Sequence, residues 1–295
     1  MAITAALVKE LREKTGAGMM DCKKALEAND GNIDKSIDWL REQGIAKSAK
    51  KSGRIAAEGL SRVKASGNKA CLIEVNSETD FVAQNEQFLA LMDKVVDIVL
   101  NANPTTMEEA LKVETDGVTL EQLFIDATAT IGEKISFRRF EILEKADDEL
   151  FGTYMHMGGK ISACAVVKSN SEEVAKDMAM QVASMSPQYV SRNDMPKEII
   201  DHERSVQEGL VKNDESLQSK PEKVLLGIVE GRLSKSLQDI TLVDQVFFKN
   251  QDIKCSQYLK DNNSSVVKFV KYAVGEGIEK REENFAEEVA KQIGK

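Results

Sequence analysis

The start of the chain contains three short blocks in which apolar residues recur every three or four positions. These residues are Leu7, Val8 and Leu11, then Cys22, Ala25 and Leu26, then Ile33, Ile37 and Leu40. Such spacing places each set on one face of a helix. Thr4 and Asn32 are expected to cap the first and third helices, and Gly44 is expected to end the third. The pattern predicts a three-helix bundle.

Beyond Gly67 the helical spacing changes to alternation, which is typical of strands. The predicted elements are a strand, a polar turn, a helix, a second helix and a second strand, over 71–75, 76–80, 88–99, 121–129 and 134–143. A similar order then recurs: a hairpin turn at 158–160, a strand over 161–167, a polar turn over 170–173 and a helix over 174–185. The repeated order predicts two related α+β subdomains.

Two charge-rich stretches, 196–211 and 221–237, have helical spacing and are joined by a polar loop. Their apolar residues are expected to face each other: Ile199, Ile200, Val206 and Leu210 against Val224, Leu225, Ile228 and Leu233. Two antiparallel helices of this kind form a projecting hairpin, a common place for protein contacts. The chain is expected to finish with a strand over 266–274 and a short end helix through Phe285, Val289 and Ile293.

The composition narrows the class of protein. The chain has 295 residues, 42% hydrophobic and 30% charged, which is too apolar for a disordered protein and about the size of two domains. The net charge of −9 and the low aromatic content of 5% disfavour direct nucleic-acid binding. We expect no membrane span and no secretory signal, and therefore a cytoplasmic protein. The widely spaced Cys22, Cys71, Cys164 and Cys255 are expected to be reduced structural thiols.

Charge is spread unevenly along the chain. Residues 1–64 hold 13 Lys or Arg and 9 Asp or Glu, net +4, whereas residues 65–295 hold 27 and 40, net −13. This asymmetry indicates a separate N-terminal module. The basic residues of 47–54 fit either a solvated linker helix or a segment that docks onto an acidic partner.

No pattern typical of an enzyme is present in the sequence. There are two histidines, His156 and His202, and no nucleophile elbow, phosphate-binding loop or zinc-protease motif. Gly158-Gly159-Lys160 lacks the rest of a phosphate loop, and Gly275-Glu276-Gly277 is interpreted as a turn after a strand. We therefore expect no catalytic residue, no cofactor and no metal site.

The segment Thr79-Asp80-Phe81-Val82 is unusual because it places Phe and Val in a polar turn between a strand and a helix. Phe81 could fold back onto its own helix as a hydrophobic staple, with Thr79 or Asp80 as the cap. It could instead be an exposed aromatic anchor for a pocket on a partner, where such residues dominate binding energy. The composition alone leaves both interpretations open.

Two long motifs resemble signatures of the bacterial elongation factor Ts family: Leu-Arg-Glu-Lys-Thr-Gly-Ala-Gly-Met-Met-Asp-Cys-Lys-Lys-Ala-Leu at 11–26 and Glu-Val-Asn-Ser-Glu-Thr-Asp-Phe-Val-Ala at 74–83. Shorter similarities follow in family order, at 155–161, 229–233 and 274–280. One position departs from the family: Gln245-Val246-Phe247 stands where Gln-Pro-Phe is common. This departure leaves the local turn open but does not affect the resemblance.

The resemblance implies an α+β fold in five parts. They are an N-terminal three-helix domain similar to ubiquitin-associated domains, two related core subdomains with antiparallel sheets, an inserted helical hairpin and a C-terminal module. The implied boundaries are 1–54 for the first domain, 55–145 for the first subdomain, 146–190 with 238–265 for the second, 191–237 for the hairpin and 266–295 for the C-terminal module.

The resemblance also implies a function. Members of the family are guanine-nucleotide exchange factors for elongation factor Tu, which they bind in its GDP-bound and nucleotide-free forms. Thr79, Asp80, Phe81 and Val82 would displace Mg²⁺ from Tu, and the implied further contacts are Arg12, Met19, Met20 and His156. The hairpin could support a homodimer. The competing interpretation is a ribosome- or RNA-associated module that uses the basic segment 47–64.

Overall fold

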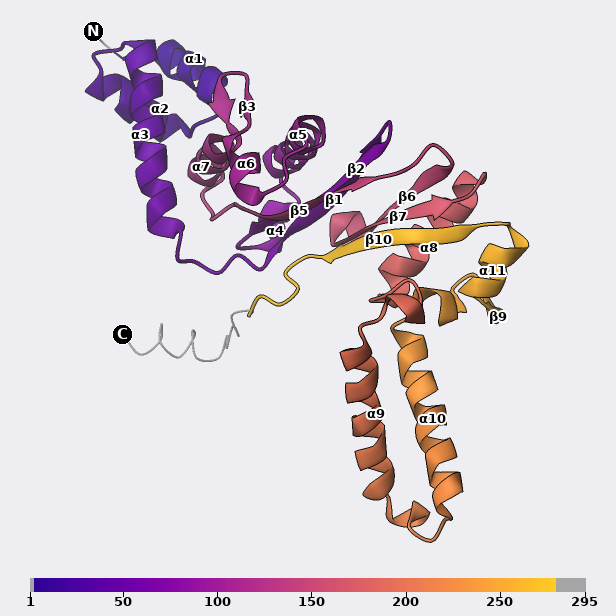
Figure 1. Ribbon diagram of the computed structural model, residues 1–295. Coiled ribbons are helices and arrows are strands. Elements are labelled where there is room, and N and C mark those ends of the chain that lie inside the picture. Colours follow the sequence, from indigo (N-terminus) through magenta and orange to yellow (C-terminus); the bar gives the residue numbers. More distant parts are fainter. Residues whose placement is uncertain (1–2, 280–295) are drawn as a thin grey trace.

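The computed structural model describes residues 3–279, which form an elongated core with an N-terminal helical domain at one end and a projecting helical hairpin (Figure 1). The N-terminal domain consists of α1 (Ala5–Thr15), α2 (Met19–Ala28) and α3 (Ile33–Lys51). The predicted apolar faces form its core, in which Leu11, Cys22 and Leu26 are fully buried. The Thr4 hydroxyl accepts a hydrogen bond from the Leu7 amide and the Asn32 side chain accepts one from the Lys35 amide, so both predicted caps are confirmed.

The prediction that Gly44 ends the third helix is wrong. α3 continues through Gly44 to Lys51, and Gly44 is buried. A Cβ atom built on Gly44 would lie 3.4 Å from the Cβ atom of Ala129 in α7 (Leu120–Ile131). Glycine therefore serves close packing between two helices here, and the first part of the basic segment 47–54 is the last turn of a packed helix.

The first sheet is antiparallel, with the strand order β1-β2-β5. Its strands are β1 (Glu58–Ser66), β2 (Lys69–Ser77) and β5 (Ser136–Glu144). Helices α5 (Glu86–Ala102) and α7 cover one face, where Phe88 and Met92 are fully buried against Ile73. Between them lie α6 (Met107–Lys112) and the small hairpin of β3 (Glu114–Thr115) and β4 (Val118–Thr119). The sequence pattern did not predict β1, because polar and basic residues fill the second half of this edge strand.

The second sheet repeats this plan, with the strand order β10-β7-β6 and antiparallel pairing throughout. Its strands are β6 (Glu149–His156), β7 (Ile161–Lys168) and β10 (Ser265–Ala273). Helix α8 (Glu172–Met185) covers its outer face. The sheets pack face to face through Leu72, Cys164 and Val166, among others, so the core has helices outside and two sheets inside (Figure 1). The predicted α+β class with antiparallel sheets is confirmed.

The last described strand, β10, is an edge strand of the second sheet. β10 pairs with β7 along its length, so most of 266–274, expected as the opening of a C-terminal module, completes the second sheet. The turn after it, at 274–277, is present as predicted. The expected end helix through Phe285, Val289 and Ile293 lies outside the described residues.

The hairpin consists of α9 (Lys197–Lys212) and α10 (Glu222–Asp239), which project from the core (Figure 1). Leu233 is buried as predicted, and Ile200, Leu225 and Ile228 are partly buried in the two apolar clusters that join the helices. The predicted pairing is wrong for the remaining four residues, which are each at least 40% exposed: Ile199, Val206, Leu210 and Val224.

A short segment connects the hairpin to β10. It consists of β8 (Val246–Phe247), β9 (Asn250–Lys254) and α11 (Cys255–Asp261). At the position where the family commonly has proline, Val246 lies in β8 beside the buried Gln245, whose side-chain amide donates to the carbonyls of Met185 and Asp239. The family departure is therefore accommodated in a short strand.

All four cysteines are free and buried, as expected for structural thiols. Burial raises the pKa of Cys71, Cys164 and Cys255 to about 12. These thiols therefore stay protonated at neutral pH and are poor nucleophiles.

Candidate partner-binding site

The segment 79–82 forms the short helix α4 (Asp80–Ala83) and its cap. The Thr79 hydroxyl accepts a hydrogen bond from the Val82 amide, so Thr79 is the cap that the sequence left open between Thr79 and Asp80. Ala83 is buried and Val82 packs against the core of the first subdomain, whereas Asp80 is exposed. One side of α4 is therefore fixed to the core and the other faces solvent.

Phe81 is 83% exposed, the highest value among the exposed large apolar residues of the described chain. It does not fold back as a hydrophobic staple on its own helix, so that interpretation is wrong. An exposed phenylalanine on a helix held by its neighbours has the geometry of an anchor for a partner's pocket.

His156 lies at the end of β6, and its Nδ1 atom is 3.2 Å from the Tyr154 hydroxyl. Its sequence neighbours Met155 and Met157 are 43% and 70% exposed, so two apolar side chains are accessible on this part of the surface. Sequence reasoning missed these two methionines, although the alternation Met-His-Met was visible. Flexible, polarisable methionine side chains are well suited to contacts with a partner.

The turn after His156 (residues 157–160, the His156 turn) and the loop that carries α4 (residues 78–85, the α4 loop) both border β1. Ser77, just before the α4 loop, lies opposite Glu58 at the start of β1. Ser61 of β1 donates a hydrogen bond of 2.8 Å from its hydroxyl to the Gly159 carbonyl. A Cβ atom at Gly159, where φ is +105°, would lie 2.7 Å from the Ser61 carbonyl oxygen. Glycine at 159 is therefore required for this close approach between the subdomains.

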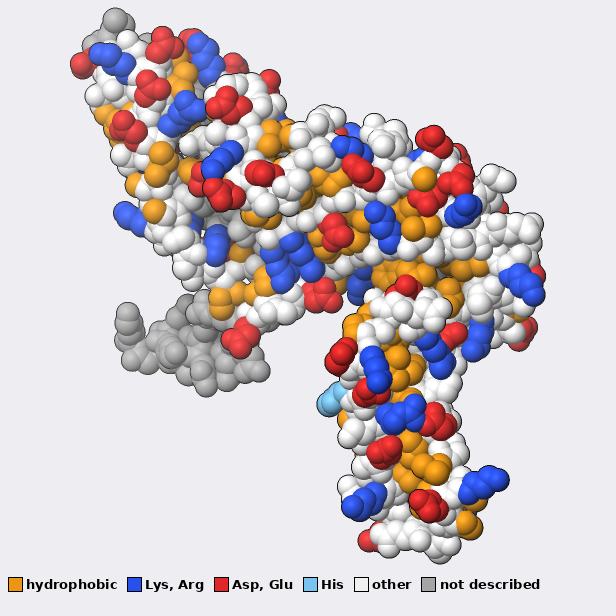
Figure 2. Space-filling view, in the orientation of Figure 1, with side chains coloured by type: hydrophobic (Ala, Val, Ile, Leu, Met, Phe, Trp, Pro, Cys, Tyr) orange, Lys and Arg blue, Asp and Glu red, His pale blue; other side chains and the backbone are white. Residues whose placement is uncertain are grey.

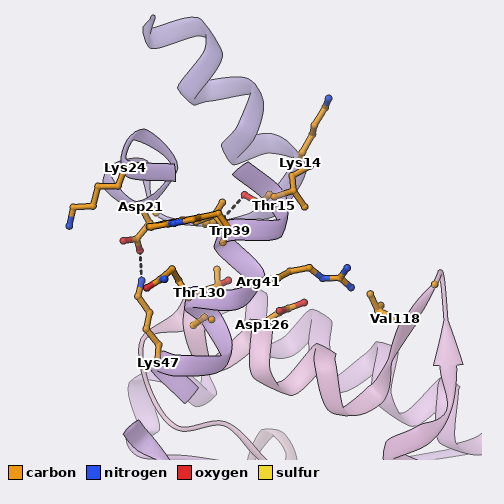
Figure 3. A pocket seen from close by; sticks show the side chains of 18 of the residues that line it. Lys14, Thr15, Asp21, Lys24, Trp39, Arg41, Lys47, Val118, Asp126 and Thr130 are labelled. Atoms are coloured by element: carbon orange, nitrogen blue, oxygen red, sulfur yellow. Dashed lines mark hydrogen bonds and ion pairs between the residues drawn. The ribbon is translucent and has the colours of Figure 1, made fainter. Parts of the chain in front are cut away.

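Arg12, Met19 and Met20 lie around the turn between α1 and α2 of the N-terminal domain, and all three are exposed. The turn itself depends on Gly16, which has φ of +67° at the end of α1. Thr15, Ala17 and Gly18 of the same turn line a hollow of about 550 Å³ where the bundle, through α3, meets α7 and the β3–β4 hairpin (Figure 3). None of the three exposed residues lines this hollow.

The basic segment 47–64 makes most of its polar contacts inside the chain. On the face shown in Figure 2, Lys and Arg side chains of the N-terminal domain are interspersed with Asp and Glu. Its cations contact acceptors elsewhere in the chain: Lys47 pairs with Asp21, Lys51 with the Gly132 carbonyl, Arg54 with Glu78, Arg62 with Asp93 and Lys64 with Asp97. The Lys47–Asp21 pair is drawn in Figure 3. Such pairing leaves little positive charge for a phosphate backbone.

Within 3–279, no helix is both long enough and apolar enough to cross a membrane. Over the same range, no group of three or more His, Cys, Asp or Glu side chains is arranged to hold a metal ion.

The described residues thus form a doubled α+β core that presents an exposed aromatic side chain on α4. Comparison with known proteins gives its family. The family model described as elongation factor TS matches residues 78–276, a stretch that includes α4, the His156 turn and the hairpin. The chain is also 51% identical over 296 residues to elongation factor Ts of Acholeplasma laidlawii (strain PG-8A), with both chains covered completely.

The chain therefore belongs to the elongation factor Ts family, and its role is that of a translation elongation factor.

Proposed function

We propose that the chain binds elongation factor Tu in its GDP-bound and nucleotide-free forms and promotes release of GDP, so that GTP can replace it. The observation that carries this proposal is the 83% exposure of Phe81 on a helix whose opposite side is fixed to the core. The proposal describes a cytoplasmic exchange factor that breaks no covalent bond and needs no cofactor or metal of its own.

The thermodynamics of exchange follow from linkage between two binding equilibria. A protein that binds nucleotide-free Tu more tightly than GDP-bound Tu must weaken GDP binding by the same factor. Each 1.4 kcal/mol of differential binding is worth about tenfold in affinity. Contacts made only with the nucleotide-free form are therefore the ones that drive release.

Phe81 is suited to make such contacts. An exposed aromatic ring can insert between packed elements of the partner, which shift between discrete arrangements. Nucleotide is held in GTPases by backbone amides of the phosphate loop and by Mg²⁺. Because Mg²⁺ demands near-ideal octahedral geometry, a small shift of its ligands weakens the binding of the ion. We assign insertion to Phe81 and charge and hydrogen bonding near the Mg²⁺ site to Asp80, and we assign to Thr79 and Val82, which cap α4 and pack it against the core, the role of holding these two residues in place.

The remaining expected contacts would supply affinity. On the N-terminal domain, Met19, Met20 and Arg12 are exposed, and near the end of β6 the exposed Met155 and Met157 flank His156 in the sequence. We assign these two surfaces to binding of Tu away from the nucleotide. The exposed apolar residues of the hairpin, which include Val206 and Leu210, support its proposed role in self-association.

The decisive test measures release of fluorescent GDP from Tu with and without this protein. Acceleration that saturates with protein concentration supports the proposal, and an unchanged release rate contradicts it. A parallel titration with RNA tests the competing function. Affinity for RNA that falls steeply with salt would favour a ribosome-associated module.

A further inference from the structure

Three segments far apart in the sequence meet beside α4 and are joined by hydrogen bonds. They are residues 51–54 at the end of α3, residues 77–79 before α4, and residues 132–134 after α7. We refer to residues 132–134 as the α7 turn. None of its residues belongs to the sequence motifs or the proposed contacts described above.

Glu133 of the α7 turn holds the backbone from which α4 starts. One of its carboxylate oxygens accepts hydrogen bonds from the amides of Glu78 and Thr79, at 3.1 and 2.9 Å. The other accepts one from the Thr79 hydroxyl at 2.7 Å. In return, the Glu78 carboxylate accepts a hydrogen bond of 2.6 Å from the Lys134 amide. Each segment thus satisfies the backbone donors of the other with a charged acceptor.

This exchange matters because α4 has only four residues. A helix of one turn fixes several dihedral angles for few hydrogen bonds and is not stable by itself. Thr79 is its cap and is bound by Glu133 through both its amide and its hydroxyl. Hydrogen bonds with one charged partner are about twice as strong as neutral ones. The direction in which Phe81 projects therefore depends on Glu133.

The α7 turn is itself fixed to the end of α3. The Lys51 ammonium donates to the Gly132 carbonyl at 2.6 Å, and the Lys134 ammonium donates to the carbonyls of Ser52 and Arg54 at 2.6 and 2.9 Å. Arg54 also pairs with Glu78 at 3.3 Å. The position of Glu133 is therefore set by the N-terminal domain as well as by α7.

We propose that Glu133 is a positioning residue for the exchange reaction. It holds α4 so that Phe81 projects in the orientation needed to open the nucleotide site of Tu. This inference rests on the proposed function of Phe81. It also gives the end of the basic segment 47–54 a role inside the molecule, as the support of the α7 turn.

The test is Glu133→Gln, which keeps the size of the side chain. An amide group has only one acceptor oxygen, so the substituted side chain can still accept from the two backbone amides but no longer also from the Thr79 hydroxyl, and its negative charge is lost. We expect the GDP-release rate at saturating protein to fall about three- to tenfold, since charged hydrogen bonds are lost. The half-saturating concentration and the melting temperature should change little. Glu121→Gln, at an exposed glutamate in the first turn of α7, is the matched control and should leave the rate unchanged.

A double substitution separates positioning from a general structural effect. If Glu133 acts through Phe81, adding Glu133→Gln to Phe81→Ala should slow release no further. An equal additional loss in the Phe81→Ala background would overturn the proposal, as would a normal saturated rate for Glu133→Gln alone.

A measurement without Tu distinguishes this proposal from the proposed function. Hydrogen exchange of the amides of residues 78–84 in the free protein should be faster in Glu133→Gln than in the parent chain. Unchanged exchange would refute the positioning role of Glu133. Faster hydrogen exchange in the variant, together with a parent chain that never accelerates GDP release, would retain the local role and refute the nucleotide-exchange activity instead.

Discussion

The two core subdomains share a plan but differ in one connection. In each, the central strand leads to the helix that covers the outer face of its sheet, β2 to α5 and β7 to α8. Between β7 and α8 there is only the short turn 169–171, and Ser171 caps α8 directly. Between β2 and α5 the chain forms the additional helix α4 and exposes Phe81. The proposed function thus depends on a longer loop in one copy of a repeated scaffold.

The largest expected effect distinguishes Phe81, which lies in that loop, from Phe88, which lies in the helix after it. Phe88 is fully buried in α5, so Phe88→Ala should lower the free energy of unfolding by about 3–5 kcal/mol. Phe81→Ala removes an exposed ring and should lower it by less than about 0.5 kcal/mol. Urea denaturation of the two variants measures this difference. A large destabilisation by Phe81→Ala would mean that the ring supports its own subdomain.

The next effect concerns the layer between the two sheets, which differs in charge between the subdomains. On this face β7 carries Cys164 and Val166, whereas β2 carries the fully buried Glu74. Burial alone raises the pKa of Glu74, but hydrogen bonds from the Gly275 amide, Arg138 and Arg139 outweigh it, and the pKa lies below its usual range. A register irregularity in β5 lets both guanidinium groups reach this carboxylate, at 2.8 and 2.6 Å.

The sign of the resulting pH dependence follows from the lowered pKa. Glu74 contributes stability above about pH 4.3, its unfolded pKa, and this contribution is lost as the pH falls through the lower folded value. Glu74→Gln should cost about 3 kcal/mol at neutral pH and flatten the decline of stability in acid. Urea denaturation between neutral and acid pH measures both effects. The exposed Asp148→Asn is the control, and equal acid sensitivity of parent and Glu74→Gln would contradict this assignment.

A smaller effect compares the caps of the two connections. The Thr79 and Ser171 hydroxyls each accept a hydrogen bond from an amide at the start of the following helix, at 3.4 Å in both cases. Substitution of either by alanine should cost about 1 kcal/mol of stability. Only Thr79→Ala should also slow GDP release, because only α4 carries the proposed insertion residue. If Ser171→Ala slowed release equally, the comparison between the two loops would fail.

Local patterns in the sequence were enough to predict most helices, the repeated subdomains and the hairpin. They failed where tertiary packing overrides local preference. Gly44 is a good terminator in isolation, but its packing against Ala129 of α7 makes it an interior residue of α3. β1 was missed because a partly exposed edge strand with basic residues has no clear alternation.

The candidate site was predictable to a similar extent. The motif resemblance identified Phe81, but its exposure could not be decided, because a staple and an anchor have the same local sequence. Glu133 could not be found from its own surroundings, since its partners Glu78 and Thr79 lie more than fifty residues away. The same holds for Glu74 and Gly275, which are joined across most of the chain by a hydrogen bond of 2.9 Å.

The central claim is that Phe81 acts on the Mg²⁺ and nucleotide site of Tu and has little structural role in its own subdomain. The most direct test compares GDP release from Tu by the parent chain and by Phe81→Ala at high and low free Mg²⁺, beside a thermal melt of each protein. We predict an unchanged melt and a release rate reduced by about tenfold or more at high Mg²⁺, equivalent to about 1.4 kcal/mol. The reduction should shrink when Mg²⁺ is chelated, because displacement of the ion is then no longer needed. A large drop in melting temperature with normal release per folded molecule would contradict the claim.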